Sequence, residues 1–176
     1  MKHFKNFKTC VYCTAQTLAS LDEATLARDY AYLEKYVGID KVYLETYRDG
    51  TWVSIDHMKM IQNFFKEHGV EIAGGITTVT PPLEKDDVKR QRLFQTFCYS
   101  NEAMRTYLKK IVTYTAELFD EIILDDFFFT SCTCDDCLRE RSNLSWAEFR
   151  SKKMIDVAEN LVLKPAKLAN PSVKVT

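Results

Sequence analysis

Apolar runs alternate with amphipathic stretches along the chain, and this alternation predicts a sheet of parallel strands connected by helices. The expected strands cover residues 9–18, 41–47, 70–79 and 121–128, and residues 172–176 begin a fifth strand. The strands are apolar runs rather than period-2 patterns, which is typical of a sheet covered on both faces. The chain is therefore expected to belong to the α/β class.

The stretches between these runs carry helical signals. Apolar side chains recur at helical spacing in three places: Leu26, Tyr30, Leu33 and Val37; Met58, Ile61 and Phe65; and Met104, Leu108, Ile111, Thr115 and Leu118. Ser20 with Glu23, and Ser145 with Glu148, have the spacing of a capping box, so helices are expected to follow both serines. The last helix is expected to stop before Pro165, which cannot continue it.

The order of these elements favours part of a (β/α)₈ barrel. Repeated βα units with short αβ turns give a parallel sheet, either open and doubly wound or closed as a barrel. A nucleotide-binding open sheet carries a glycine-rich turn after its first strand, whereas residues 19–21 contain no glycine. The loops after the third and fourth strands are long, as barrel active-site loops are. A complete barrel needs roughly 200–250 residues. Residues 1–176 are therefore expected to be one domain, the N-terminal half of a barrel, with four βα units and the start of a fifth strand.

Charge and composition narrow the range of partners. The chain has 24 basic and 25 acidic residues spread along its length, so no basic patch indicates nucleic acid or a membrane surface. No apolar run is long enough to span a bilayer. Residues 1–8 are basic but lack the apolar core of a secretory signal. The compartment stays open, since a full-length form could be periplasmic or secreted.

Two adjacent carboxylates, Asp125 and Asp126, end the otherwise apolar fourth strand and are the strongest chemical signal. Burial of unpaired charge is costly, so the pair must face water, a cation, a metal or a substrate. Catalytic residues gather at the carboxyl ends of barrel strands. Carboxyl groups this close do not ionise independently, so the pKa of one should rise, which suits a general acid. The structural alternative is that one aspartate caps the next loop and the other pairs with a surface lysine.

The end of the second expected strand supplies candidate binding residues. Glu45, Tyr47 and Arg48 are expected near the barrel mouth, and Trp52 follows them. Tyr47 and Trp52 would stack on a sugar face, while Arg48 would pair with a carboxylate. Asp125 is expected to project into the mouth, with Glu45 and Tyr47 as walls of the same cleft. The alternative is an ordinary charged surface loop.

The segment from Phe119 to Cys137 resembles a group of glycoside-hydrolase-like barrels found in bacterial genomes. The resemblance rests on the aspartate pair, the aromatic residues after it and the cysteine-rich loop. The pair is similar to that of glycoside hydrolase family 84, in which the first aspartate orients the substrate's N-acetyl group and the second is the acid/base. Asp125 also resembles the fourth-strand aspartate of family 18 chitinases and of the α-galactosidase clan. The full chitinase pattern is not kept, since Ile123 and Phe127 stand at two of its positions. The resemblance implies a carbohydrate substrate.

Cys132, Cys134 and Cys137 form a dense C-x-C-x-x-C segment. Three thiolates at this spacing can bind zinc with a fourth ligand from elsewhere, and Cys10 or Cys13 would supply it. Some barrel β-galactosidases are similar in having a cysteine-bound zinc in the loop after the same strand. The alternative is three reduced cysteines in a structured loop. The reaction is expected to need no cofactor, so the zinc would be structural.

Three functions stay open. The first is a glycosidase, whose two carboxylates usually lie about 5–9.5 Å apart, so that a later strand would supply the partner of the pair. The second is a non-catalytic carbohydrate-binding or structural half-barrel that self-associates through its open edge. The third is a metal-dependent hydrolase or lyase, but no histidine lies at an expected strand end to bind its metal.

Overall fold

The chain folds as a parallel sheet packed against helices. The computed structural model describes residues 4–79, 81–125 and 127–176. In chain order, its elements are β1 (Cys10–Cys13), α1 (Ala15–Ser20), α2 (Glu23–Tyr36), β2 (Lys41–Arg48), β3 (Thr51–Trp52), α3 (Ile55–Glu67), β4 (Glu71–Ile76), α4 (Asp86–Arg90), η1 (Leu93–Gln95), α5 (Glu102–Leu118), β5 (Glu121–Leu124), α6 (Asp135–Arg141), α7 (Trp146–Val157), η2 (Ala158–Leu163), α8 (Lys164–Ala169) and β6 (Lys174–Val175).

The strands lie side by side in the order β1-β2-β4-β5-β6, and each of these pairings is parallel. The short strand β3 pairs with β2 in the antiparallel direction and forms a hairpin extension. The predicted α/β class with a parallel sheet is confirmed. The spatial order follows the chain order without reversal, whereas a doubly wound sheet reverses at its switch point. This order is compatible with part of a barrel.

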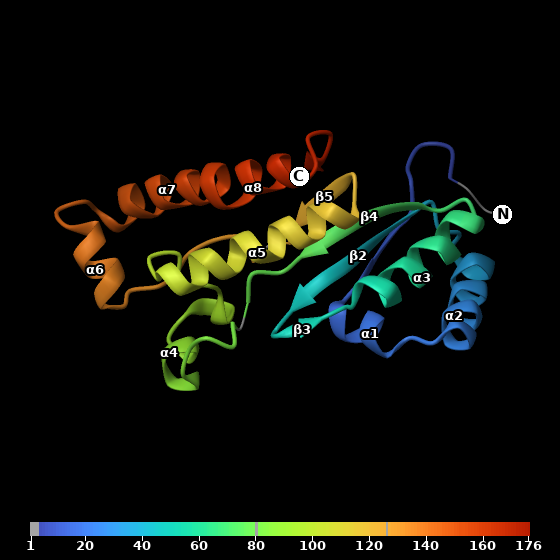
Figure 1. Ribbon diagram of the computed structural model, residues 1–176, viewed down its shortest axis with the longest axis horizontal. Helices are drawn as coiled ribbons and strands as arrows, with labels where there is room; N and C mark the ends of the chain where they lie inside the picture. The colour runs from blue at the N-terminus through green and yellow to red at the C-terminus, as the bar shows by residue number, and fades with distance from the viewer. Residues whose placement is uncertain (1–3, 80, 126) are drawn as a thin grey trace.

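One face of the sheet packs against the helices. Val42 of β2 lies in the same buried cluster as Ile61 of α3. On the same face of β2, the hydroxyl groups of Thr46 and Thr115 of α5 lie 2.6 Å apart. A Cβ atom on Gly74 would lie 2.7 Å from the Thr115 side chain, so glycine lets α5 approach the sheet closely. Figure 1 shows α3 and α5 lying along the sheet.

The opposite face carries aromatic and charged side chains. Residues two apart share a face of a strand, so Lys41, Tyr43 and Glu45 of β2 point away from the helices. The Tyr12 and Tyr43 rings stack at a centroid distance of 6.4 Å. Lys41 forms an ion pair with Glu121 of β5 at 2.5 Å. This polar face is where the candidate active site begins.

The N-terminal boundaries differ from the expected ones. The strand expected over residues 9–18 ends at Cys13, because Thr14 caps a helix with its side chain and starts α1. The predicted capping box of Ser20 and Glu23 is wrong. Asp22 caps α2 instead, accepting a hydrogen bond from a backbone N–H of the first turn. The helices therefore begin where Thr14 and Asp22 can cap them, and not where the apolar pattern alone predicted.

The C-terminal helical region gives one confirmation and one correction. The capping box of Ser145 and Glu148 is confirmed at the start of α7. The prediction that the helix stops before Pro165 is wrong, since η2 and α8 continue α7 to Ala169. The η2 segment is a π-helix, whose shifted hydrogen bonds accommodate a proline that has no N–H to donate. Across the described ranges, no helix combines the length and apolar character that a membrane span requires.

Candidate active site and cysteine cluster

The candidate active site lies where β4 and β5 end. The strands stop at Ile76 and Leu124, so Thr77 and Asp125 are the first residues beyond them. The backbone N–H of Asp125 donates a hydrogen bond to the carbonyl of Ile76 at 3.0 Å. This bond keeps the two chain segments in register just past the strands. Thr77 and Asp125 are therefore neighbours at the carboxyl edge of the sheet.

A β-bulge in β2 brings a third strand's residues to the same place. The register with β4 shifts between Glu45 and Tyr47. As a result, Thr46 and Tyr47 both pack toward the helices, and Tyr47 is fully buried with its ring 5.5 Å from that of Tyr107. Arg48 then returns to the face of Glu45. A bulge re-aims side chains in this way because one extra residue offsets the alternation.

The guanidinium group of Arg48 joins two carboxylates. Its Nε donates to Oε2 of Glu45 at 2.8 Å and lies 3.0 Å from Oε1. Its Nη2 donates to Oδ2 of Asp125 at 2.9 Å and to the Thr77 hydroxyl at 2.9 Å. The Thr77 hydroxyl lies 2.9 Å from the same Asp125 oxygen and also contacts Glu45. The four side chains thus form one connected network.

Glu45 is the fully buried member of this network. Its side chain is fully buried and accepts hydrogen bonds from the Tyr12 hydroxyl at 2.9 Å and the Ala15 N–H at 2.6 Å. A Cβ atom on Gly75 would lie 2.7 Å from the Tyr12 hydroxyl oxygen, so glycine is required for this approach. Burial and then the charge of Glu45 raise the pKa of Tyr12, which keeps its hydroxyl a donor. Glu45 is therefore placed to orient Arg48, and its burial keeps it from contacting a ligand directly.

Asp125 is the carboxylate of the network that reaches solvent. Its side chain is 20% exposed and that of Arg48 is 22% exposed, compared with 0% for Glu45. Burial lowers the pKa of Arg48, but the hydrogen bond and charge of Glu45 outweigh this effect and raise it above the ordinary value. A guanidinium that stays charged is a permanent donor to Asp125.

The structure brings some of the predicted site residues together and separates others. Glu45, Arg48 and Asp125 meet, whereas Tyr47 lies on the helix side with no exposed surface on which a sugar could stack. Trp52 is partly buried beside Tyr47, and its indole N–H donates to the Tyr107 hydroxyl at 3.0 Å. The expectation that Tyr47 lines the cleft of Asp125 therefore does not match its placement. The predicted catalytic residue Asp126 lies outside the described residues.

An aromatic cluster that involves the segment after Asp125 was not expected. Phe94, which is 61% exposed, packs its ring against Phe127 and Phe129 at centroid distances of 5.3 and 6.4 Å. The Thr78 hydroxyl donates to the carbonyl of Phe127 at 3.0 Å and fixes the start of this loop. The aromatic residues after Asp126 extend the apolar run, so the pattern predicted a strand to residue 128, whereas β5 ends at Leu124. Phe94 comes from another loop, and no local pattern indicates its position.

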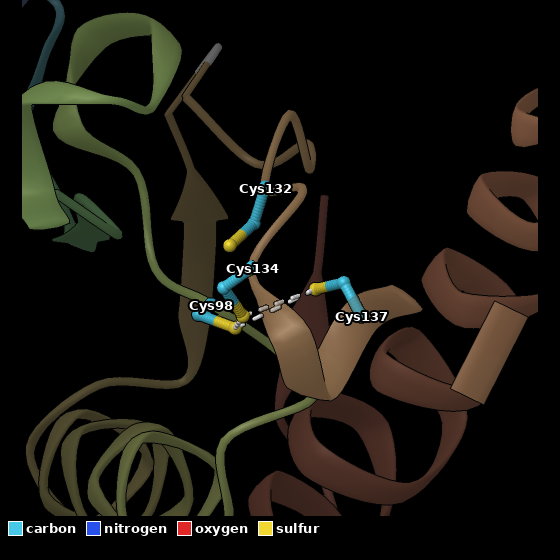
Figure 2. Close-up of side chains that lie close together, drawn as sticks. All are labelled: Cys98, Cys132, Cys134 and Cys137. Atoms are coloured by element: carbon cyan, nitrogen blue, oxygen red, sulfur yellow. Dashed lines mark hydrogen bonds between the residues drawn. The ribbon is translucent and has the colours of Figure 1, made fainter. Parts of the chain in front are cut away.

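Four cysteine sulfurs meet between two loops (Figure 2). Those of Cys98, Cys132, Cys134 and Cys137 all lie within 4.8 Å of one another. The sulfur of Cys98 is 3.7 Å from those of Cys134 and Cys137, which are 3.8 Å apart. A disulfide bond has an S–S distance of about 2.05 Å, so these cysteines are unbonded thiols. The predicted convergence of the three loop sulfurs is confirmed.

The fourth member of the cluster corrects the prediction. Cys10 and Cys13 were the expected fourth ligands, but both lie in β1 and neither joins the cluster. Cys98 takes the place instead, from the segment between η1 and α5. The sequence contained only a weak signal for it, a cysteine near the end of the long loop after β4. Spacing along the chain does not reveal that this loop folds back onto the next one.

Hydrogen bonds among the thiols shift the pKa values of Cys98, Cys132 and Cys137. Hydrogen bonds from Cys137 and Cys98 lower the pKa of Cys132 well below its ordinary value. The hydrogen bond to Cys132 raises the pKa of Cys98, and it raises that of Cys137 to about 12. Burial lowers the pKa of Arg92, but its hydrogen bond and charge interaction with Glu84 raise it above the ordinary value, and the nearby Cys132 and Cys98 add to this effect.

Two comparisons place this chain among known proteins. A family model described as "Probable glycosyl hydrolase, catalytic domain" matches residues 1–176. The chain is also 33% identical over 196 residues to an uncharacterized protein of Saccharolobus solfataricus. That alignment covers 98% of this chain and 32% of the relative, so the chain spans about a third of the relative's length. Because the family model matches the whole chain, the chain belongs to the family of probable glycosyl hydrolase catalytic domains.

Proposed function

We propose that this chain forms the first part of a (β/α)₈-barrel glycoside hydrolase and that Asp125 takes part in cleavage of a glycosidic bond. The strands follow one another in chain order, and the helices pack on the face opposite Asp125. Long loops leave the carboxyl ends of β4 and β5, where barrels build their active sites. Glycosyl hydrolases act on carbohydrates, so the family supports a carbohydrate substrate.

The observation that carries this proposal is the environment of Asp125. One oxygen of this partly exposed carboxylate receives hydrogen bonds from a charged guanidinium and a hydroxyl group. Charged and neutral donors together hold the carboxylate in one orientation, as a nucleophile or a substrate-orienting residue requires. Asp125 is proposed for that role, and Asp126 for the acid/base. A carboxylate from a later strand is the alternative partner, at the usual spacing of about 5–9.5 Å.

Glu45 and Arg48 are proposed as positioning residues. Glu45 is buried and acts on the site only through the groups that it holds. Arg48 keeps the Asp125 carboxylate in one orientation, because its guanidinium is itself fixed by Glu45 at the other end. Pre-organisation of this kind lowers the cost of reaching the transition state.

The exposed ring of Phe94 is proposed as a stacking surface for a sugar of the substrate. It packs against Phe127, which follows the aspartate pair by one residue. Phe94→Ala is expected to raise KM about fivefold with little change in kcat, because the lost contact is made equally in the ground and transition states. Phe7→Ala is the matched control, since Phe7 is also 61% exposed and stacks on Phe4 near the N-terminus. An unchanged KM in the Phe94 variant would exclude the stacking role.

A substrate screen tests the proposed activity. The full-length protein is incubated at mildly acidic pH with aryl glycosides that cover common sugars in both anomeric forms. We expect release of the aryl group from at least one of them, and loss of that release in Asp126→Asn. A protein that binds these glycosides without cleaving any of them would instead support the non-catalytic carbohydrate-binding function.

In the proposed reaction the carboxylates act on the sugar, and a metal ion would have only a structural role. Cys132, Cys134 and Cys137 are proposed to help hold a structural zinc ion, while the carboxylates would act on the sugar. Thiolates are the ligands of structural zinc sites, and a site with four of them has no open position for a substrate. The proposed hydrolysis therefore requires no cofactor.

A further inference from the structure

We infer that Cys98 completes a tetrathiolate zinc site with Cys132, Cys134 and Cys137, and that the ion fastens the loop after β4 to the loop after β5. The inference deepens the structural zinc proposed above by naming the fourth ligand and the parts that the ion joins. Its test is independent of the proposed hydrolysis, because zinc content and thiol reactivity are measured without a substrate.

The distances between the sulfurs fit a tetrahedral zinc site. A Zn–S bond is about 2.3 Å long, so two sulfurs of a regular ZnS₄ tetrahedron lie about 3.8 Å apart. The Cys98–Cys134 and Cys98–Cys137 separations are 3.7 Å, and the Cys134–Cys137 separation is 3.8 Å. Cys132 completes the group within 4.8 Å of the others. Three of the four cysteines therefore already stand at the spacing that the metal imposes.

The chemistry of the pocket selects the ion. Cys98, Cys132 and Cys137 are 1%, 3% and 1% exposed, so the cluster is closed to solvent on most sides. Four soft thiolates in a tetrahedral array favour zinc or iron over harder cations. A dication also compensates the negative charge that four buried thiolates would otherwise place together. The closed site with four protein ligands is the arrangement of structural zinc.

The ligands come from two loops that also contact each other directly. Cys98 precedes α5, whereas the other three lie in the segment from the end of β5 into α6. The Leu93 N–H donates to the Ser131 hydroxyl at 2.9 Å, and the Thr78 hydroxyl donates to the Phe127 carbonyl at 3.0 Å. An ion bound across the two loops would add four strong bonds to these contacts. It would thereby hold together the two loops that carry Phe94 and Phe127.

Metal analysis with matched serine variants tests the site. The full-length protein purified without added metal is expected to contain one zinc ion per chain. Under competition with a chelator, Cys98→Ser is expected to weaken zinc binding by at least about tenfold, because a ligand contributes more than an outer-shell partner. Cys13→Ser is the matched control, since Cys13 lies in β1 outside the cluster and should leave zinc binding unchanged. In the wild type, Co²⁺ in place of zinc should show the thiolate-to-cobalt absorption of a tetrahedral tetrathiolate site.

A second measurement on the wild type covers the case in which Cys98→Ser does not fold. A thiol reagent is expected to react with the exposed Cys10 before chelation, and the four thiols of the cluster should react as zinc is released. Hydrogen exchange should then increase in residues 93–100 and 127–137, while β2 and β4 stay protected. The inference is overturned if iron occupies the site, if zinc release exposes no additional thiols, or if Cys13→Ser loses as much zinc as Cys98→Ser.

Discussion

Asp125→Asn is expected to lower kcat/KM of the full-length protein by about a thousandfold or more, which corresponds to about 4 kcal/mol of transition-state stabilisation. Asparagine keeps the size and one acceptor oxygen of the side chain but removes its charge. Arg48 still has Glu45 as a partner, so the network does not leave a guanidinium unpaired. The melting temperature should therefore change little, and rates measured on the substrate found in the screen report the chemistry alone.

Asp120→Asn is the control for this variant. Asp120 is an exposed carboxylate just before the other end of β5, where its Oδ1 accepts a hydrogen bond from Asn170 at 2.9 Å. Its replacement removes the same charge from the same strand region, and kcat/KM should stay within about twofold of the wild type. If Asp125→Asn keeps its turnover, Asp125 is a structural member of the network and the catalytic proposal fails.

The sequence predicted the class and order of the elements well because these depend on local chemistry. Apolar runs form the strands, and the capping box of Ser145 and Glu148 begins α7 as expected. The carboxyl edge after β5 was also predictable, since Asp125 directly follows an apolar run. Local patterns of this kind are read within a few residues and do not depend on the tertiary structure.

The position of Tyr47 depended on contacts that no local pattern contains. Simple alternation places Tyr47 on the face of Glu45, but the bulge turns it toward Trp52 and Tyr107. The packing partner in α5 lies far along the chain, and the buried aromatic contact outweighs regular strand geometry. The same long-range dependence explains Cys98. Its sulfur joins the cluster only because the loop before α5 folds against the loop after β5.

Glu45→Gln is expected to lower the free energy of unfolding by about 3 kcal/mol, the range for breaking a buried ion pair. Glu45 is fully buried, and its two oxygens accept hydrogen bonds from Tyr12, Ala15 and Arg48. An amide offers one acceptor oxygen to these donors and presents its own N–H₂ group to the rest. Arg48 would keep Asp125 as a partner but lose the charge of Glu45, which is its fully buried partner. Urea denaturation followed by circular dichroism measures the change.

Glu71→Gln is the matched control, because Glu71 lies on the same face of the sheet and pairs with Lys8 at the surface. The side chains of Lys8 and Glu71 are 61% and 54% exposed, so solvent screens the pair and the free energy of unfolding should change by less than about 0.5 kcal/mol. Equal effects of the two substitutions would show that the Glu45 network contributes no more than a surface ion pair.

The two main variants should differ in what they lose. Asp125→Asn is expected to reduce the rate while stability is kept, because its carboxylate reaches solvent and would contact the substrate. Glu45→Gln is expected to reduce both, because Glu45 acts on the reaction only by holding Arg48, and Arg48 in turn orients Asp125. The double variant should then lose little more rate than Asp125→Asn alone, since a positioning residue has no further effect once the group it positions is removed. Additive losses in rate would instead mean that Glu45 reaches the substrate by a route that does not pass through Asp125.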